Sequence, residues 1–468
     1  MTPDEFRKNG HALIDMIADY RTNVETRPVR SQSEVGELLD WLPDNPPKYS
    51  EDAGVLLDEI AAQVAPAMTH WQHPSFFAYF PANADLSSVL GDLASSGFGQ
   101  LGLNWQSSPP LTEFEDRMCD WMRQLLGLSA GWHGVIQDTA STSTLVALLC
   151  AREKSTDFGQ IRSGLRGEQE LVVYSSSQAH SSITKAALLA GFGKNQLRSC
   201  AVTDEFAVDL ADLRRQLDED VADNRKPCAI VACTGTTATT AMDDLKGLAD
   251  LAQEYGCWLH VDGAMAGSAM ILPEMRHLWD GVERADSIVF NPHKWLGVVI
   301  DCSIYYVRDE QHLVRVMSTN PSYLQTSADG EAPNYRDWGI PLGRRFRAMK
   351  LWWLLRCEGA DKLQNRLRRD IENARWLEQQ LAEQADWHLI APVALQTLCV
   401  VHRPAAIAES ELDAYTQAWC ESINASGEAM LTPAVVGGAW VVRISIGALA
   451  TERRHVEQLW RTMQKHTA

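Results

Sequence analysis

Apolar positions along the first 84 residues recur at helical spacing. Thr2, Pro3 and Glu5 form a capping-box pattern that starts the first helix. Apolar side chains follow along one face of this helix, and a second helical pattern covers 55–68. Helices of this kind cannot bury their apolar faces in a core of their own. We therefore expect them to pack either on the rest of the same chain or on a second subunit.

Between residues 85 and 350, helical segments alternate with short apolar runs. Helical patterns cover 111–128 and 142–153. The apolar runs predict strands at 171–177, 229–235, 257–262, 286–290 and 302–307. This alternation predicts an α/β fold with a mostly parallel central sheet and helices on both faces. Ligands of such sheets bind beyond the carboxyl ends of the strands, so we expect the functional residues there.

The last part of the chain has a different pattern. A long helical stretch covers 351–384, and strand patterns follow at 389–402 and in a hairpin that turns at Gly437 and Gly438. A final helix follows the hairpin. The sequence therefore predicts three parts, namely an N-terminal helical segment at 1–84, a large domain at 85–350 and a small C-terminal α+β domain at 351–468.

Composition and charge argue against several classes of partner. The 468 residues include 61 acidic and 42 basic side chains, and the net charge of −19 opposes binding to nucleic acid or to an anionic membrane. Acidic residues among the first twenty do not fit an export signal, and no uncharged apolar run approaches the ~18 residues of a membrane span. The ten cysteines are scattered without a CxxC pair, which indicates reduced thiols in a cytoplasmic protein.

The stretch SIVFNPHKWLG carries the most informative residue, Lys294. A predicted strand places this lysine just beyond its carboxyl end, beside Phe290, Trp295 and Leu296. Apolar surroundings disfavour the cationic form of an amine, which lowers its pKa and makes it a nucleophile toward a carbonyl group. We therefore expect Schiff-base chemistry at Lys294. The alternative is a surface lysine whose stem packs on apolar neighbours.

Asp262 ends the preceding predicted strand, CWLHVD, and small residues follow it. The interval between Asp262 and Lys294 leaves room for a helix that returns to the next strand, so both side chains are expected at one rim of the sheet. Pyridoxal phosphate needs this pair, because a lysine holds its aldehyde and a carboxylate keeps its pyridine nitrogen protonated. A metal site with His260 is the alternative for Asp262, but no further ligand spacing supports it.

A third part of the same site is predicted where a loop becomes an apolar helix. The segment VIQDTASTSTLVALL places small and hydroxyl-bearing residues at 139–142, at the start of that helix. A helix N-terminus presents free backbone amides to a phosphate group. Serine and threonine also cap helices in general, so this segment gains its meaning from the lysine and the aspartate.

Five motifs resemble the group II pyridoxal-phosphate decarboxylases, in the branch of the aromatic L-amino-acid decarboxylases. They are NPHKW, HVDGAMAGS, QDTASTSTLVALL, SSQAHSSITKAALLAGFG and TGTTATTAMDDL. The similarity runs from EFRKNGHALIDMIADY to VVRISIGALAT and includes bacterial enzymes that act on DOPA or tryptophan. It implies a pyridoxal-phosphate-dependent transferase fold (fold type I) and a homodimer whose N-terminal helices clasp the other subunit. It implies no metal.

The resemblance also implies a role for each matching residue. Lys294 would form the Schiff base with the cofactor, and Asp262 would bind its pyridinium nitrogen. His180 would stack on the ring and help to place the substrate carboxylate, although a histidine taken alone is more often structural. The residues implied to contact the rest of the cofactor are Ala264 and Thr237 at the ring, Ala140, Ser141 and Asn291 at the phosphate, and His293 beside the lysine.

The substrate pocket and the proton donor are implied by the same resemblance. The pocket residues would be Trp71, Tyr79, Phe80 and Pro81, with Leu101 and Leu103 from the neighbouring subunit and Gly343 leaving room for an indole. An aromatic cluster can equally be core. Tyr323, in the polar segment 317–331, matches the family's proton donor. Asp138 and Met265 depart from the family pattern, and we expect Asp138 to point away from the phosphate.

These features predict decarboxylation of an aromatic L-amino acid to its amine, with DOPA, tyrosine, tryptophan, 5-hydroxytryptophan and phenylalanine all open as substrates. Cysteine desulfuration on the same scaffold needs a cysteine on a mobile loop, and residues 303–356 contain none. An aldehyde synthase is a nearer alternative, but such enzymes tend to replace the loop tyrosine or the stacking histidine. A noncatalytic protein that binds the cofactor is the remaining alternative.

Overall fold

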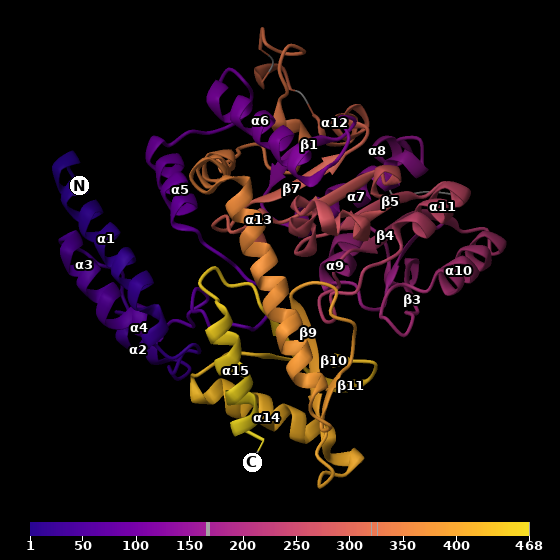
Figure 1. The fold of residues 1–468 in the computed structure, drawn as a ribbon. Helices are drawn as coiled ribbons and strands as arrows, with labels where there is room; N and C mark the ends of the chain where they lie inside the picture. Colours follow the sequence, from indigo (N-terminus) through magenta and orange to yellow (C-terminus); the bar gives the residue numbers. More distant parts are fainter. Residues whose placement is uncertain (165–168, 320, 325, 468) are drawn as a thin grey trace. The chain divides into compact units, whose positions relative to one another are not determined.

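The computed structural model describes residues 1–164, 169–319, 321–324 and 326–467. They group into two compact units, whose elements are labelled in Figure 1. The smaller unit contains Met1–Pro81, Arg375–His388 and Val400–Ala468, and the larger unit contains Ala82–Ala374 and Leu389–Cys399. The three-part division at residues 84 and 350 stays a prediction. None of the described helices combines the length and the apolar character that a membrane crossing requires.

The larger unit is built on a seven-stranded sheet in the order β1-β7-β6-β5-β4-β2-β3. The strands are β1 His133–Gln137, β2 Leu171–Ser176, β3 Leu197–Cys200, β4 Lys226–Cys233, β5 Trp258–Asp262, β6 Ser287–Phe290 and β7 Ser303–Val307. Strand β7 is antiparallel to β1 and β6, and the other neighbouring strands are parallel. The expected mostly parallel sheet is confirmed, and so are the five strands predicted between residues 171 and 307. Strands β1 and β3 were not predicted.

Helices cover both faces of this sheet, as expected. Helices α7 and α9 pack with apolar side chains of β2, β4 and β7 in one continuous core. Helices α10 and α11 contact β4, and their buried leucines lie outside that core, on the other face. The helices of the larger unit are α5 Leu86–Phe98, α6 Pro109–Leu126, α7 Ala140–Ser155, α8 Gly159–Ser163, α9 Ser181–Leu189, α10 Leu210–Ala222, α11 Leu245–Tyr255, α12 Glu310–Met317 and the first part of α13 Arg347–Ala382.

The connection from β5 to β6 differs from the expectation of a helix. It consists of three short 3-10 segments, Ala266–Ile271, Pro273–Trp279 and Val282–Arg284. Close packing explains the difference, since a Cβ on Gly267 would lie 2.6 Å from the Cβ of Phe290 and one on Gly281 would meet the backbone of α11 at 2.7 Å. The prediction of a returning helix was wrong, but the two strands are still parallel neighbours.

Helix α13 is broken near its first third. Gly359 has φ +71° and ψ 159°, a conformation that side chains of L-residues rarely adopt. Before this break, the buried Lys350 forms an ion pair with Asp92 of α5 at 3.1 Å. After it, Arg366 and Asp370 contact the segment that contains Lys294. The first part of α13 thus contacts α5, and the second part contacts the segment that contains Lys294.

The smaller unit combines helices with most of a four-stranded sheet. The sheet has the order β10-β11-β9-β8, and β10 and β11 form the hairpin predicted at Gly437 and Gly438. Residues 390–396, within the predicted strand 389–402, are not a strand. The elements are α1 Pro3–Asn23, α2 Glu37–Trp41, α3 Ala53–Glu59, α4 Ala65–Ala67, β8 Trp387–Leu389, β9 Thr397–His402, α14 Leu412–Ser426, β10 Thr432–Val436, β11 Ala439–Ser445 and α15 Arg453–Lys465. The capping box at Thr2 is present as predicted.

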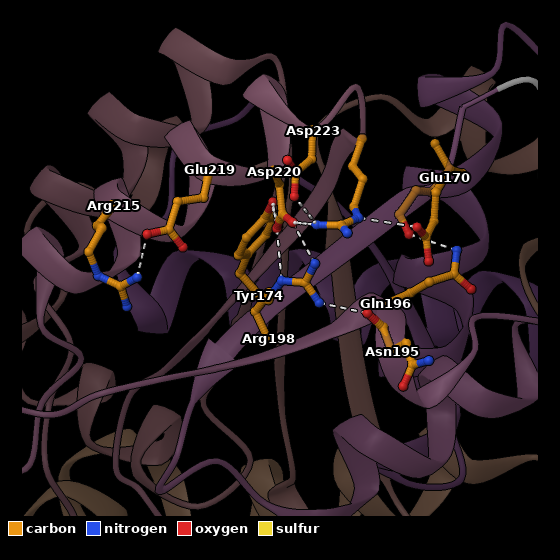
Figure 2. Close-up of polar contacts among 11 residues, drawn as sticks. Glu170, Tyr174, Asn195, Gln196, Arg198, Arg215, Glu219, Asp220 and Asp223 are labelled. Carbon is orange, nitrogen blue, oxygen red and sulfur yellow. Dashed lines mark hydrogen bonds and ion pairs between the residues drawn. The ribbon is translucent and has the colours of Figure 1, made fainter.

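A buried carboxylate forms hydrogen bonds with side chains of β2 and β3, at one edge of the large sheet (Figure 2). Asp220, near the end of α10, accepts hydrogen bonds from the Tyr174 hydroxyl at 2.7 Å and from Arg198 Nε at 2.9 Å. Arg225 Nη1 donates to its other oxygen at 2.9 Å. Burial alone would raise the pKa of Asp220, but the hydrogen bonds from Arg198, Tyr174 and Arg225 outweigh it and lower the pKa. Asp220 therefore joins two strands and a helix as a charged group.

Replacement of Asp220 by alanine should lower the free energy of unfolding by about 3 kcal/mol, because it leaves the buried Tyr174 hydroxyl and two guanidinium groups without their shared acceptor. Denaturant unfolding of the purified protein measures this loss. Asp223→Ala is the matched control, since Asp223 is exposed and its ion pair with Arg225 should contribute less than about 1 kcal/mol. The difference from wild type should be full above pH ~4 and shrink at lower pH, because the folded pKa of Asp220 is lowered. Equal losses in both variants would contradict this account.

Candidate active site

Two neighbouring parallel strands bring the predicted lysine and aspartate to one rim of the sheet. Asp262 is the last residue of β5, and its pairing partner on β6 is Val289. Lys294 follows β6 by four residues, in the π-helical turn Pro292–Leu296, where its own ψ of −108° is not helical. The backbone N–H of Asn291 donates to Ala264 O at 2.9 Å, so the segments that follow the two strands are tied together.

Helix α13 holds the turn that carries Lys294. Arg366 Nη2 donates to the carbonyl oxygens of Trp295 and Leu296 at 2.8 and 2.7 Å, and Trp295 Nε1 donates to Asp370 at 2.9 Å. Trp295 and Leu296 are fully buried, and burial raises the pKa of Asp370 to about 6. The sequence pattern indicates no role for Arg366 or Asp370. Nothing in the pattern indicates that this part of the long helix reaches the lysine segment.

The ring of His180 lies close enough to Asp262 and Lys294 for their charges to act on it. Burial lowers the pKa of His180, the Asp262 carboxylate raises it and the Lys294 amine lowers it. His180 caps α9, where its Nδ1 accepts the backbone N–H of Ser182 at 3.1 Å. The imidazole is therefore neutral near pH 7 and carries its proton on Nε2. The three residues predicted to act on the cofactor ring thus lie together.

The carboxylate of Asp262 is itself oriented by the backbone. Its Oδ1 accepts the N–H of Ala264 at 3.0 Å, and the side chain is 9 % exposed. Ala264 is half-buried after the strand end, as a residue in contact with a cofactor ring should be. Met265, which departs from the family pattern, is buried, and its sulfur accepts a hydrogen bond from Gln396 at 3.2 Å. Local packing thus accommodates Met265.

The predicted phosphate site lies at the start of α7. Ala140 and Ser141 begin this helix, where backbone N–H groups lack intrahelical acceptors. The carboxylate of Asp138 accepts the N–H of Thr139 at 2.7 Å, so this acidic side chain turns to its own backbone. Asn291 is 3 % exposed, and its Oδ1 has no hydrogen-bond partner among the described residues. Backbone N–H groups at the start of α7 and the side-chain NH2 of Asn291 can donate to phosphate oxygens, and the residues therefore fit pyridoxal phosphate.

Thr237 and His293 complete the cofactor set in different ways. Thr237 is exposed in the loop after β4, which Gly235 shapes with φ +86°, since a Cβ there would lie 2.5 Å from the Cβ of Ala266. His293 is buried, and its Nδ1 accepts the N–H of Cys302 at 2.9 Å. Burial and the adjacent Lys294 lower the pKa of His293 to about 4, so its ring is neutral. Its visible role is to hold the lysine segment in place.

The predicted substrate residues belong to both units. In the smaller unit, Trp71 stacks on Tyr79 with ring centroids 5.6 Å apart, and Arg443 lies 4.0 Å above the ring of Phe80. Pro81 is buried in the same unit. The remaining three, Leu101, Leu103 and Gly343, belong to the larger unit, where a Cβ on Gly343 would lie 3.1 Å from Leu101 Cδ1. Tyr323 lies in the short turn Ser322–Leu324, and its side chain is outside the described part of the chain.

A cavity of about 950 Å³ in the larger unit contains none of these residues. It is lined by α6, the start of β1, α12 and residues 330–338. The cavity therefore lies at the amino-terminal end of β1, whereas Asp138 follows the carboxyl end of this strand. Its lining mixes acidic and basic side chains. The candidate site is therefore identified by its chemistry at the strand ends and not by cavity size.

Comparison with known proteins places this chemistry in a family. Residues 36–403 match the pyridoxal-dependent decarboxylase conserved domain. The chain is 39 % identical to tyrosine decarboxylase 1 of Narcissus pseudonarcissus, over 100 % of this chain and 93 % of that protein. It is 37 % identical to phenylacetaldehyde synthase of Petunia hybrida, over 100 % of this chain and 95 % of that protein.

A solved structure is also similar to this chain in fold and sequence. The crystal structure of Oryza sativa TDC with PLP and tryptamine superposes with a TM-score of 0.97 at 36 % identity, over 100 % of this chain and 98 % of that chain. This agreement confirms the expected pyridoxal-phosphate-dependent fold. The chain therefore belongs to the pyridoxal-dependent decarboxylases.

Proposed function

We propose that this protein decarboxylates aromatic L-amino acids to the corresponding amines. The observation that carries the proposal is the joint position of Lys294, Asp262 and His180 at one rim of the sheet, in a chain whose relatives include a tyrosine decarboxylase. Bound pyridoxal phosphate supplies an electron sink for the bond that breaks at Cα. The protein's own side chains supply binding, orientation and protons.

For each residue we propose the role that the resemblance to the family implies. Lys294 would hold the cofactor aldehyde, and Asp262 would accept the ring N–H. The neutral His180 would stack on the ring and direct its Nε2–H toward the substrate carboxylate. Ala140, Ser141 and Asn291 would bind the phosphate. Ala264 would press on the ring face opposite to His180, Thr237 would support the ring from below, and His293 would lie beside the lysine. Tyr323 donates the proton that Cα receives after carbon dioxide leaves.

We assign the substrate side chain to an aromatic cluster of one subunit, completed by aliphatic residues of the partner subunit. Trp71, Tyr79, Phe80 and Pro81 offer flat apolar surfaces, and Arg443 is already engaged above Phe80. The resemblance implies that Gly343 leaves room for an indole. In the structure Leu101 of the same chain packs closely on this glycine, since a Cβ there would lie 3.1 Å from Leu101 Cδ1. Such a lining favours an aromatic side chain over an acidic one. We place the protein in the cytoplasm, because all ten cysteines of the described chain are free thiols.

A product assay tests the proposed reaction. The protein loaded with pyridoxal phosphate is given tyrosine, DOPA, tryptophan, 5-hydroxytryptophan and phenylalanine in turn, and amine, aldehyde, carbon dioxide and hydrogen peroxide are measured. Amine in equal amount to carbon dioxide supports decarboxylation. Aldehyde with peroxide supports the second candidate, an aldehyde synthase, which the Petunia relative favours. A visible cofactor band that borohydride removes, without any product, indicates a noncatalytic binder.

The assembly we propose is a homodimer held by the N-terminal helices. None of the side chains of α1 is fully buried, and Phe6, Val55 and Leu56 remain 59 %, 46 % and 47 % exposed. Exposed apolar faces of this kind are typical of a surface that a second copy covers. The pocket is expected to take Leu101 and Leu103 from that copy.

Deletion of residues 1–60 should therefore give inactive or aggregated protein, because the apolar partner surface loses its cover. Light scattering after size exclusion measures the mass, and the amine assay measures activity. Phe6→Ser is a milder companion variant, which should weaken the dimer while leaving the fold of the larger unit intact. A truncated protein that is monomeric and fully active would contradict the clasp.

A further inference from the structure

A row of buried polar side chains lies beneath Asp262, and the proposed chemistry does not use it. Trp258, His260 and Asp262 alternate along β5, so they share the face that α7 covers. Ser287 on β6 and Thr144 on α7 contact His260 from its two sides. Trp258 is 2 % exposed, and His260, Ser287 and Thr144 are 0 % exposed.

The donors and acceptors of this row fix one arrangement of protons. Trp258 Nε1 can only donate, and it donates to Ser287 Oγ at 2.9 Å. The Thr144 hydroxyl donates to Ala140 O at 2.9 Å, so its oxygen is left to accept from His260 Nε2–H at 3.5 Å. His260 Nδ1 then accepts from the Ser287 hydroxyl at 2.9 Å. All four bonds run in the same direction, from Trp258 to Ala140.

The imidazole in the middle of this row is neutral. Burial lowers the pKa of His260 to about 4, against the opposing effect of the Asp262 carboxylate. Both ring nitrogens face hydroxyl groups, and the described residues contain no group of three or more side chains that could hold a metal ion. The earlier alternative of a metal site at His260 and Asp262 therefore has no ligand nitrogen left to use.

The row connects the two parts of the proposed cofactor site, through its end at Ala140 and through its central residue His260. Ala140 is the first residue of α7, where the phosphate is placed, and Asp262 is two residues from His260 on β5, where the ring nitrogen is placed. We propose that His260 is a positioning residue that holds the first turn of α7 and the end of β5 at a fixed separation, so that one bound cofactor engages both. This inference rests on the phosphate and ring assignments of the proposed function.

Comparison of pyridoxal phosphate with pyridoxal, which lacks the phosphate, tests this role. Holoenzyme is stripped of cofactor, and the dissociation constants of both compounds are measured by absorbance for wild type, Thr144→Val, Ser287→Ala and His260→Phe. Loss of one hydrogen bond that aligns the phosphate should weaken pyridoxal phosphate binding about fivefold and leave pyridoxal binding nearly unchanged. The circular dichroism of the visible cofactor band should also change, because the ring is held less firmly.

Controls separate positioning from a general loss of stability. Ser303→Ala removes another fully buried serine hydroxyl from the same sheet, one without a hydrogen-bond partner among the described residues, and should leave both constants unchanged. His260→Gln, which can still donate toward Thr144, should recover part of the loss. If His260→Phe does not fold, the smaller changes at Thr144 and Ser287 still decide the matter.

Two results would overturn the inference, and they differ in what else they affect. If wild type prefers pyridoxal phosphate and the variants keep the same preference while melting at a lower temperature, the row is only structural and the proposed function stands. If wild type binds both compounds equally, the phosphate site at α7 is wrong, and the inference fails together with that assignment.

Discussion

Replacement of Lys294 by alanine abolishes amine formation and leaves the larger unit folded. The Schiff-base amine is lost, whereas the buried Trp295 and Leu296 and their contacts with Arg366 stay in place. Activity should fall by several orders of magnitude, since covalent attachment of the cofactor is the step that all later chemistry requires. The visible band of the bound cofactor should also disappear, and circular dichroism should report an unchanged fold.

Lys185→Ala is the control for this experiment, because Lys185 is an exposed lysine on α9 of the same unit. It should retain the wild-type rate and the cofactor band. Wild-type turnover by Lys294→Ala would show that the cofactor is held elsewhere. Added methylamine offers a further check, since a small amine that enters the vacated space should restore a measurable part of the activity.

Tyr323→Phe should slow amine formation by ~10²–10⁴-fold, the usual contribution of a general acid. The variant loses one hydroxyl and keeps the aromatic ring. Carbon dioxide can still leave, but Cα waits longer for its proton. Dissolved oxygen can then take two electrons from that carbon to give hydrogen peroxide, and hydrolysis gives aldehyde and ammonia.

The ratio of amine to aldehyde and peroxide measures this change. Tyr49→Phe is the control, because Tyr49 is 76 % exposed and lies far from 323 in the sequence. It should keep the product ratio of wild type. Amine at the wild-type rate from Tyr323→Phe, with no peroxide, would exclude Tyr323 as the proton donor and make His180 the next candidate, since His293 is engaged with Cys302.

The sequence correctly predicted those strands and turns that have a clear pattern within a few consecutive residues. The apolar runs of β2, β4, β5, β6 and β7 and the Gly437–Gly438 hairpin were all found where their residues indicated. Strands β1 and β3 were missed because they are short and only partly buried, with Gly134 in one and Arg198 and Ser199 in the other. The connection from β5 to β6 was mistaken because close packing at Gly267 and Gly281 depends on residues far apart in the chain.

The same distinction applies to the site. Lys294 and Asp262 were predictable because each ends or follows a strand of clear pattern, and parallel neighbours bring their ends together. The row through His260 was not, since its partners Thr144 and Ser287 lie 116 and 27 residues away in the sequence. Arg366 and Asp370 were missed for the same reason. Their contacts depend on where α13 is broken and on the direction of its second part, and residue spacing alone reveals neither.

The break in α13 at Gly359 limits where the chain can tolerate insertions and deletions. Arg366 and Asp370 reach the Lys294 segment only because they project from one side of the second part of that helix. Each residue inserted or deleted between Gly359 and Arg366 would turn that side by about 100°. The guanidinium of Arg366 would then leave the carbonyl groups of Trp295 and Leu296. This interval is therefore fixed in length, whereas exposed loops elsewhere can grow or shrink at little expense to catalysis.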